Sequence, residues 1–177
     1  GDSVMSNPDM IRMAGIVRES IVDGPGIRFT VFCQGCPHKC EGCHNPETHS
    51  FSAGYLRDVS DVLKEISELE FQDGITLSGG DPLCQIDACL EIAKHTQNLG
   101  LNVWCYTGYT LEELVQENDP ARMQLLGLTD TLVDGPFVEE LRDPDLHFRG
   151  SSNQRLIHLT EEKDDAVAGT VPMIPFK

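Results

Sequence analysis

Short runs of apolar residues recur along most of the chain and are separated by polar stretches. In the first of them, residues 27–33, apolar side chains occupy positions 27, 29, 31 and 33, and this period of two predicts a β-strand. Further short apolar runs predict strands at 74–77, 101–106, 131–133 and 155–159. The apolar pattern therefore predicts a series of short strands spread over the chain.

Between these strands, the apolar positions follow the spacing of a helix. Over residues 59–69 they recur every three or four residues, which predicts an amphipathic helix. A second helix is expected between residues 82 and 100, and a third from residue 111. Signals that favour a helix start precede each of them: Asp58 or Ser60, Asp81 with Pro82, and Thr110 with Glu113.

The alternation of strand, loop and helix predicts βα units joined into a parallel sheet, which is an α/β fold. Each candidate site described below follows the C-terminal end of a predicted strand, where open α/β sheets and barrels bind their ligands. The units are too few to close an eight-stranded barrel. We expect one domain over residues 14–177. A disordered or tag-derived segment is expected at 1–13, because the chain begins with a polar stretch and with glycine instead of methionine.

Composition excludes several classes of partner. With 177 residues, of which 40% are hydrophobic and 24% charged, the sequence is typical of a globular protein. The net charge of −16 argues against nucleic acid and against an anionic membrane as ligands. The chain contains no apolar run of about eighteen residues that would span a membrane, and its first ten residues lack the apolar core of a secretory signal. We therefore expect a cytoplasmic protein.

Three closely spaced cysteines follow the first predicted strand. Cys36, Cys40 and Cys43 lie within one short loop, and thiolates are the soft ligands that hold iron–sulfur clusters or zinc. A zinc site usually takes four ligands in two separated pairs, so this spacing favours a cluster. A [4Fe–4S] cube has four irons, and three thiolates leave one iron open for a substrate.

Cys33 leaves a second interpretation open. Together with the three loop cysteines it would complete the ligands of a four-cysteine electron-transfer cluster. Its position in the period-two pattern of the strand places it instead among the core residues, and we expect core packing. The scattered cysteines Cys84, Cys89 and Cys105 are expected to be small buried apolar residues.

One further turn that follows a predicted strand, and one residue of the cysteine loop, are candidate binding groups. Gly79, Gly80 and Asp81 lie between a strand and a helix, where glycine lets the backbone approach a ligand and free N–H groups are exposed. The alternative for this segment is an ordinary tight turn. His44 directly follows the last loop cysteine and either contacts a cofactor or faces water.

The motif C-x3-C-x2-C resembles the signature loop of the radical S-adenosylmethionine (SAM) enzymes. Longer stretches are similar to the glycyl-radical-enzyme activases within that family, and most similar to the subgroup that acts on anaerobic ribonucleoside-triphosphate reductase. These stretches are residues 23–30, 35–46, 78–83 and 149–155. The resemblance covers nearly the whole chain after residue 14.

The resemblance implies a partial, open (β/α) barrel of the radical SAM type, with one [4Fe–4S] cluster held by Cys36, Cys40 and Cys43. It implies SAM contacts from three segments: Gly42, Cys43 and His44; Gly79, Gly80 and Asp81; Thr107 and Gly108. Many relatives carry glutamate where this chain has Asp81. A polar loop with Arg149, Ser152 and Asn153 either binds SAM or the substrate protein, or is a hydrogen-bonded surface turn. No catalytic side chain is expected beyond the cluster and SAM.

The implied reaction is reductive cleavage of SAM, followed by removal of a hydrogen atom from a glycine Cα of a partner glycyl radical enzyme. The partner is expected to be anaerobic ribonucleoside-triphosphate reductase, with a one-electron donor such as a flavodoxin or a ferredoxin. A pyruvate formate-lyase-type activase and a small-molecule radical SAM enzyme are the enzymatic alternatives. A four-cysteine electron carrier is the alternative from another class. The sequence between Cys43 and Gly79 lacks further cysteines, which argues against an additional ferredoxin-like insert.

Overall fold

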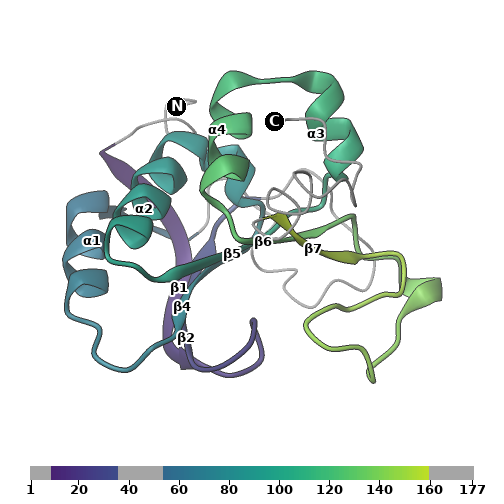
Figure 1. The fold of residues 1–177 in the computed structure, drawn as a ribbon, viewed down its shortest axis with the longest axis horizontal. Helices are drawn as coiled ribbons and strands as arrows, with labels where there is room; N and C mark the ends of the chain where they lie inside the picture. Colours follow the sequence, from purple (N-terminus) through teal and green to yellow (C-terminus); the bar gives the residue numbers. More distant parts are fainter. Residues whose placement is uncertain (1–8, 36–53, 160–177) are drawn as a thin grey trace, which may run out of the picture.

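A computed structural model describes residues 9–35 and 54–159 of the protein (Figure 1). Its strands are β1 Met10–Ser20, β2 Arg28–Cys33, β3 Tyr55–Asp58, β4 Gly74–Gly79, β5 Asn102–Tyr106, β6 Thr131–Asp134 and β7 Arg155–His158. Its helices are α1 Val59–Ser67, α2 Ile86–Asn98, α3 Leu111–Glu117 and α4 Pro120–Leu128, with short 3-10 helices at η3 Pro82–Gln85 and η4 Glu139–Leu141. None of the helices in these described ranges is long and apolar enough to cross a membrane.

The strands form one open sheet in the order β3-β1-β2-β4-β5-β6-β7. The central strands β2, β4, β5 and β6 are parallel, whereas β1, β3 and β7 run antiparallel to their neighbours. Helices α1, α2 and α4 lie on one side of the sheet (Figure 1). The predicted α/β class is confirmed, and the unclosed sheet agrees with the expected partial barrel. The last predicted strand is present as β7. It forms one edge of the sheet and pairs antiparallel with β6, not parallel as predicted.

The N-terminal boundary expected at residue 13 is wrong, because β1 begins at Met10. Ile11 and Met13 are fully buried in the core and therefore belong to the domain. The pairing of β1 with β2 shifts register between Met13 and Gly15. This irregularity interrupts the alternation of apolar and polar residues by which a strand is recognised. The edge strand β3, just before the first helix, was likewise not predicted.

The two faces of the central strands differ in chemistry. On β2, Phe29, Val31 and Cys33 are buried on the helix side, and the Cys33 sulfur lies 4.0 Å from that of Cys89 on α2. The prediction that Cys33 packs in the core is therefore confirmed. On α2, the Cys89 thiol is hydrogen-bonded to Cys33 and buried, and both raise its pKa well above the usual range. This thiol therefore stays protonated and unreactive. The opposite face of β2 carries Arg28, which is buried on the side of the sheet without helices.

Candidate functional site

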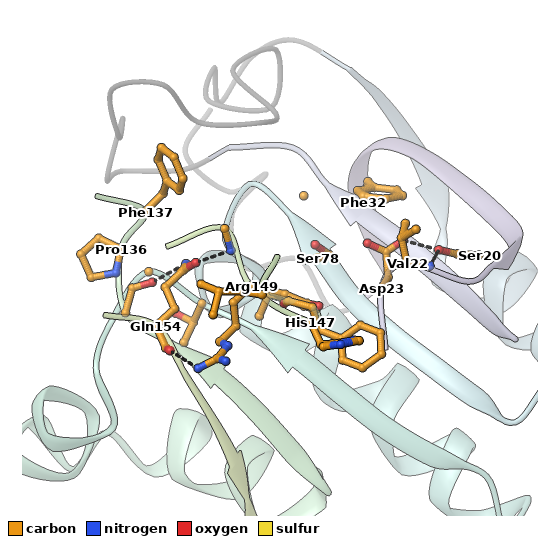
Figure 2. A pocket seen from close by; sticks show the side chains of 18 of the residues that line it. Ser20, Val22, Asp23, Phe32, Ser78, Pro136, Phe137, His147, Arg149 and Gln154 are labelled. Carbon is orange, nitrogen blue, oxygen red and sulfur yellow. Dashed lines mark hydrogen bonds between the residues drawn. The ribbon is translucent and has the colours of Figure 1, made fainter. Parts of the chain in front are cut away.

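A cavity of about 910 Å³ lies at the C-terminal ends of the parallel strands, on the face of the sheet opposite the helices. Pockets that bind small molecules typically measure roughly 300–1,000 Å³. Its walls are drawn from residues 17–23, Phe32, residues 78–80, residues 106–108 and the loop 135–154. Figure 2 shows Ser20, Val22, Asp23 and Phe32 on one side of the cavity, with Pro136, Phe137 and Gln154 on the other.

The turn after β4 is joined by its backbone to the segment that leads into the cysteine loop. The N–H of Gly80 donates to the carbonyl of Cys33 (2.7 Å), and the N–H of Asp81 donates to the carbonyl of Gly35 (2.8 Å). Gly79 has φ +93°, and a Cβ at this position would lie 2.5 Å from the Cys33 nitrogen. Only glycine fits this close approach. The turn at 79–81 and the start of the cysteine loop, which sequence analysis treated as separate sites, are therefore part of one local structure.

Asp81 lies beneath the cavity surface and is not one of the residues that line it. Its side chain is fully buried. The carboxylate accepts hydrogen bonds from the Thr107 hydroxyl (3.0 Å), the Gly108 N–H (3.0 Å) and the Leu83 N–H (3.1 Å). The carboxylate thus caps η3, as its position before Pro82 predicted, and also connects the turn after β4 to the turn after β5. This geometry favours a positioning role for Asp81 over the direct SAM contact that the family resemblance implies.

The remaining predicted SAM residues of the described part line the cavity. Gly79, Gly80, Thr107 and Gly108 all belong to its wall. The Thr107 hydroxyl is directed to Asp81, and the Thr107 N–H donates to the carbonyl of Val133 (3.0 Å). These turns therefore face the cavity mainly with backbone groups.

The polar loop motif at 149–155 is largely explained by the structure of the loop itself. The Gln154 side chain accepts from the N–H groups of Gly150 (2.9 Å) and Ser151 (3.1 Å) and donates to the carbonyl of Gly135 (3.0 Å). Asn153 donates to the carbonyl of Pro136 (2.8 Å). The predicted binding residues Ser152 and Asn153 are not part of the cavity wall, and Ser152 is exposed to solvent.

Arg149, the third residue predicted in this loop, does line the cavity. One guanidinium nitrogen donates to the carbonyl of Gln154 (3.2 Å). Its Nε is buried and has no hydrogen-bond partner among the residues that the structure describes. A buried cationic donor without an acceptor is costly, and this nitrogen lies below the cavity surface.

Arg28 anchors the turn between β1 and β2, a role that the sequence did not reveal. Its side chain is 1% exposed and donates to the Thr76 hydroxyl (2.8 Å) and to the side-chain oxygen of Asn102 (2.7 Å). The Thr76 hydroxyl in turn donates to the carbonyl of Asp23 (2.8 Å), a cavity residue. Burial lowers the pKa of Arg28 to about 10, so the guanidinium is still charged at neutral pH. The sequence signal for this role was the position of Arg28, a charged residue within a predicted apolar strand.

The predicted cluster ligands Cys36, Cys40 and Cys43 lie outside the described residues, as do Gly42 and His44. The described chain reaches Gly35, whose backbone is bound to Asp81 beside the cavity.

Comparisons with known proteins give the same family as the longer sequence stretches that resemble the reductase activases. A family model described as "4Fe-4S single cluster domain" matches residues 22–157. The anaerobic ribonucleoside-triphosphate reductase-activating protein of Escherichia coli K12 is 40% identical over 148 residues, which are 78% of this chain and 93% of the relative. The protein of the same name from Enterobacteria phage T4 is 35% identical over 142 residues, covering 76% of this chain and 86% of the relative.

Among solved structures, the crystal structure of QueE from Escherichia coli has a TM-score of 0.46 and 15% sequence identity, covering 57% of this chain and 54% of that one. The sequence relatives are far more similar, and they match this chain over most of their own length. The chain carries a 4Fe–4S single cluster domain and belongs to the family of the anaerobic ribonucleoside-triphosphate reductase-activating proteins.

Proposed function

We propose that this protein activates an anaerobic ribonucleoside-triphosphate reductase by cleaving SAM reductively at a [4Fe–4S] cluster and generating a radical on a glycine of the reductase. The observation that carries the proposal is the 40% identity to activating proteins over 93% of their length. We further propose that the protein acts in the cytoplasm and receives its electron from a small carrier such as a flavodoxin or a ferredoxin.

The described residues fit SAM in size and chemistry. SAM combines a charged amino acid with a nucleoside, and the cavity of about 910 Å³ accommodates a molecule of this class. Gly79, Gly80 and Gly108 line the cavity without side chains, so a ligand can approach their main chain closely, and Phe32 offers an aromatic surface for a base. Arg149 lines the cavity, and its guanidinium charge suits the SAM carboxylate.

Cys36, Cys40 and Cys43 would hold the cluster and leave one of its irons without a protein ligand. When bound, the cluster and SAM supply the one-electron chemistry that breaks a carbon–sulfur bond and removes a hydrogen atom from glycine. The protein's own residues position the reactants. The turn at 79–81 keeps the start of the cysteine loop beside the cavity through its hydrogen bonds to residues 33 and 35. Asp81 accepts hydrogen bonds from Thr107 and Gly108 and so holds the turn after β5 beside the turn at 79–81. Gly42 and His44 complete the proposed SAM contacts.

The function can be tested with the anaerobically reconstituted protein. After reduction with dithionite and addition of SAM, 5′-deoxyadenosine is expected, whereas a four-cysteine electron carrier would form none. With purified reductase present, an EPR doublet of a glycyl radical should then appear. SAM cleavage accompanied by a doublet on pyruvate formate-lyase, and none on the reductase, would contradict the proposed partner.

Replacing Arg149 by methionine is expected to lower the affinity for SAM by about tenfold or more, since a hydrogen bond to a charged group contributes about 1.5–3 kcal/mol. Equilibrium binding of SAM to the reconstituted protein measures the effect. Arg18→Met is the matched control, because Arg18 pairs with Glu65 on the surface. Equal affinity in wild type and Arg149→Met would exclude the carboxylate contact.

A further inference from the structure

The loop 135–154 forms one wall of the cavity, and its base is well fixed. Arg142 and Ser151 pair as an isolated antiparallel bridge. The N–H of Asp143 donates to the carbonyl of Gly150 (3.2 Å), and the N–H of Ser152 donates to the carbonyl of Leu141 (2.9 Å). These bonds hold the base of the loop together, but they do not fix where its tip lies.

The tip of the loop, residues 146–149, is attached to the sheet through β5. The Tyr106 hydroxyl donates to the carbonyl of Phe148 (2.8 Å). The Phe148 ring packs edge-on against Trp104, with ring centroids 5.3 Å apart. Both contacts come from side chains on the same face of one strand. The hydrogen bond from Tyr106 is therefore the polar part of this attachment.

The backbone of Phe148 indicates that the tip needs this attachment. Its φ is +62°, a left-handed conformation that is strained for a residue other than glycine or asparagine. Such a conformation persists where surrounding contacts impose it. Burial and the nearby Asp23 raise the pKa of the Tyr106 phenol, so that its hydroxyl remains a donor at physiological pH.

Trp104 also lies near the turn on the other side of the cavity. A Cβ added to Gly24 would meet the Arg28 side chain first, at 2.6 Å, and the Trp104 ring at 3.3 Å, so this turn packs on Arg28 with Trp104 beside it. Residues 20–23 of the same turn line the cavity, as do His147 and Phe148 of the tip. Figure 2 shows Ser20, Val22 and Asp23 of the turn together with His147 of the tip. The turn and the tip therefore converge on one aromatic residue two positions before the end of β5, away from the turn at 79–81.

We propose that Tyr106 is a positioning residue that sets the width of the opening between residues 20–23 and the tip 146–149, through which the glycine-bearing segment of the reductase enters. The inference rests on the proposed function. By holding the Phe148 carbonyl, the Tyr106 hydroxyl keeps the tip at a fixed distance from the turn, and the reductase meets a preformed slot.

Tyr106→Phe tests the proposal, because it removes the hydroxyl and keeps the ring. The KM for the reductase is expected to rise about fivefold, whereas kcat should change much less. A fivefold change corresponds to the loss of one hydrogen bond that contributes about 1 kcal/mol. Hydrogen exchange at the amides of residues 147–150 should become faster, while exchange in β2 stays as in wild type. Phe148→Ala, which removes the contact with Trp104, should change KM and exchange in the same direction.

Tyr109→Phe is the matched control, since Tyr109 packs against Arg122 and does not line the cavity. Wild-type exchange at 147–150 and a wild-type KM in both Tyr106→Phe and Phe148→Ala would overturn the proposal. Hydrogen exchange requires neither cluster nor reductase. It therefore separates a failure of this inference from a failure of the proposed function, in which wild type itself forms no glycyl radical.

Discussion

Cys40→Ala is expected to lose the iron–sulfur cluster and all cleavage of SAM, whereas Cys33→Ala is expected to retain both. Removing one of three thiolates leaves a cluster with too few ligands to assemble. The Cys33 side chain is fully buried on the helix side of the sheet, against Cys89, and the cavity lies on the other side. Iron and sulfide content, together with the EPR spectrum of the reduced protein, measure the difference.

Cys89→Ala serves as the control for core packing, because it shortens the other member of the same buried pair. Both Cys33→Ala and Cys89→Ala should lower the free energy of unfolding modestly, as expected for a small void in the core. A folded Cys33→Ala protein that has lost its iron would instead indicate a cluster with four cysteine ligands, and the electron-carrier alternative would then be correct.

Asp81→Ala is expected to reduce both stability and SAM affinity. Three donors, on Leu83, Thr107 and Gly108, would lose their acceptor in the protein interior. We expect a loss of about 3 kcal/mol in the free energy of unfolding, since each unsatisfied buried group costs about 1–3 kcal/mol. Because the two turns at the cavity floor are no longer held together, SAM affinity should fall about tenfold. Chemical denaturation of the apoprotein and equilibrium SAM binding measure the two effects.

Asp119→Ala is the matched control, since Asp119 caps α4 by accepting from the N–H of Arg122 (3.0 Å) and does not line the cavity. It should cost about 1 kcal/mol of stability, the usual value of an N-cap, and leave SAM binding unchanged. If Asp81→Ala lost SAM affinity with full stability, Asp81 would be a direct ligand and not a positioning residue.

The strands with regular apolar runs could be predicted from sequence, because burial between the sheet and its helices produces that pattern locally. β2, β4 and β5 were found in this way, and the capping box of Thr110 and Glu113 is present at the start of α3. β1 was missed because its register shift interrupts the period. The direction of β7 depends on pairing with β6, which neighbouring residues do not encode.

Sequence analysis located residues of the candidate site more accurately than it assigned their roles. Gly79, Gly80, Thr107 and Gly108 line the cavity as expected. The role of Asp81 differs because its partners, Thr107 and Gly108, are distant in sequence. For the same reason the contacts of Arg28 and Tyr106 could not be anticipated, since each acts on a segment that only the folded sheet brings near.

The absence of a side chain at Gly79 has a mechanical consequence. The ends of β2 and β4 are so close there that a methyl group would have to push the two strands apart. Whatever displaces the base of the cysteine loop must therefore also displace the floor on which SAM is proposed to rest.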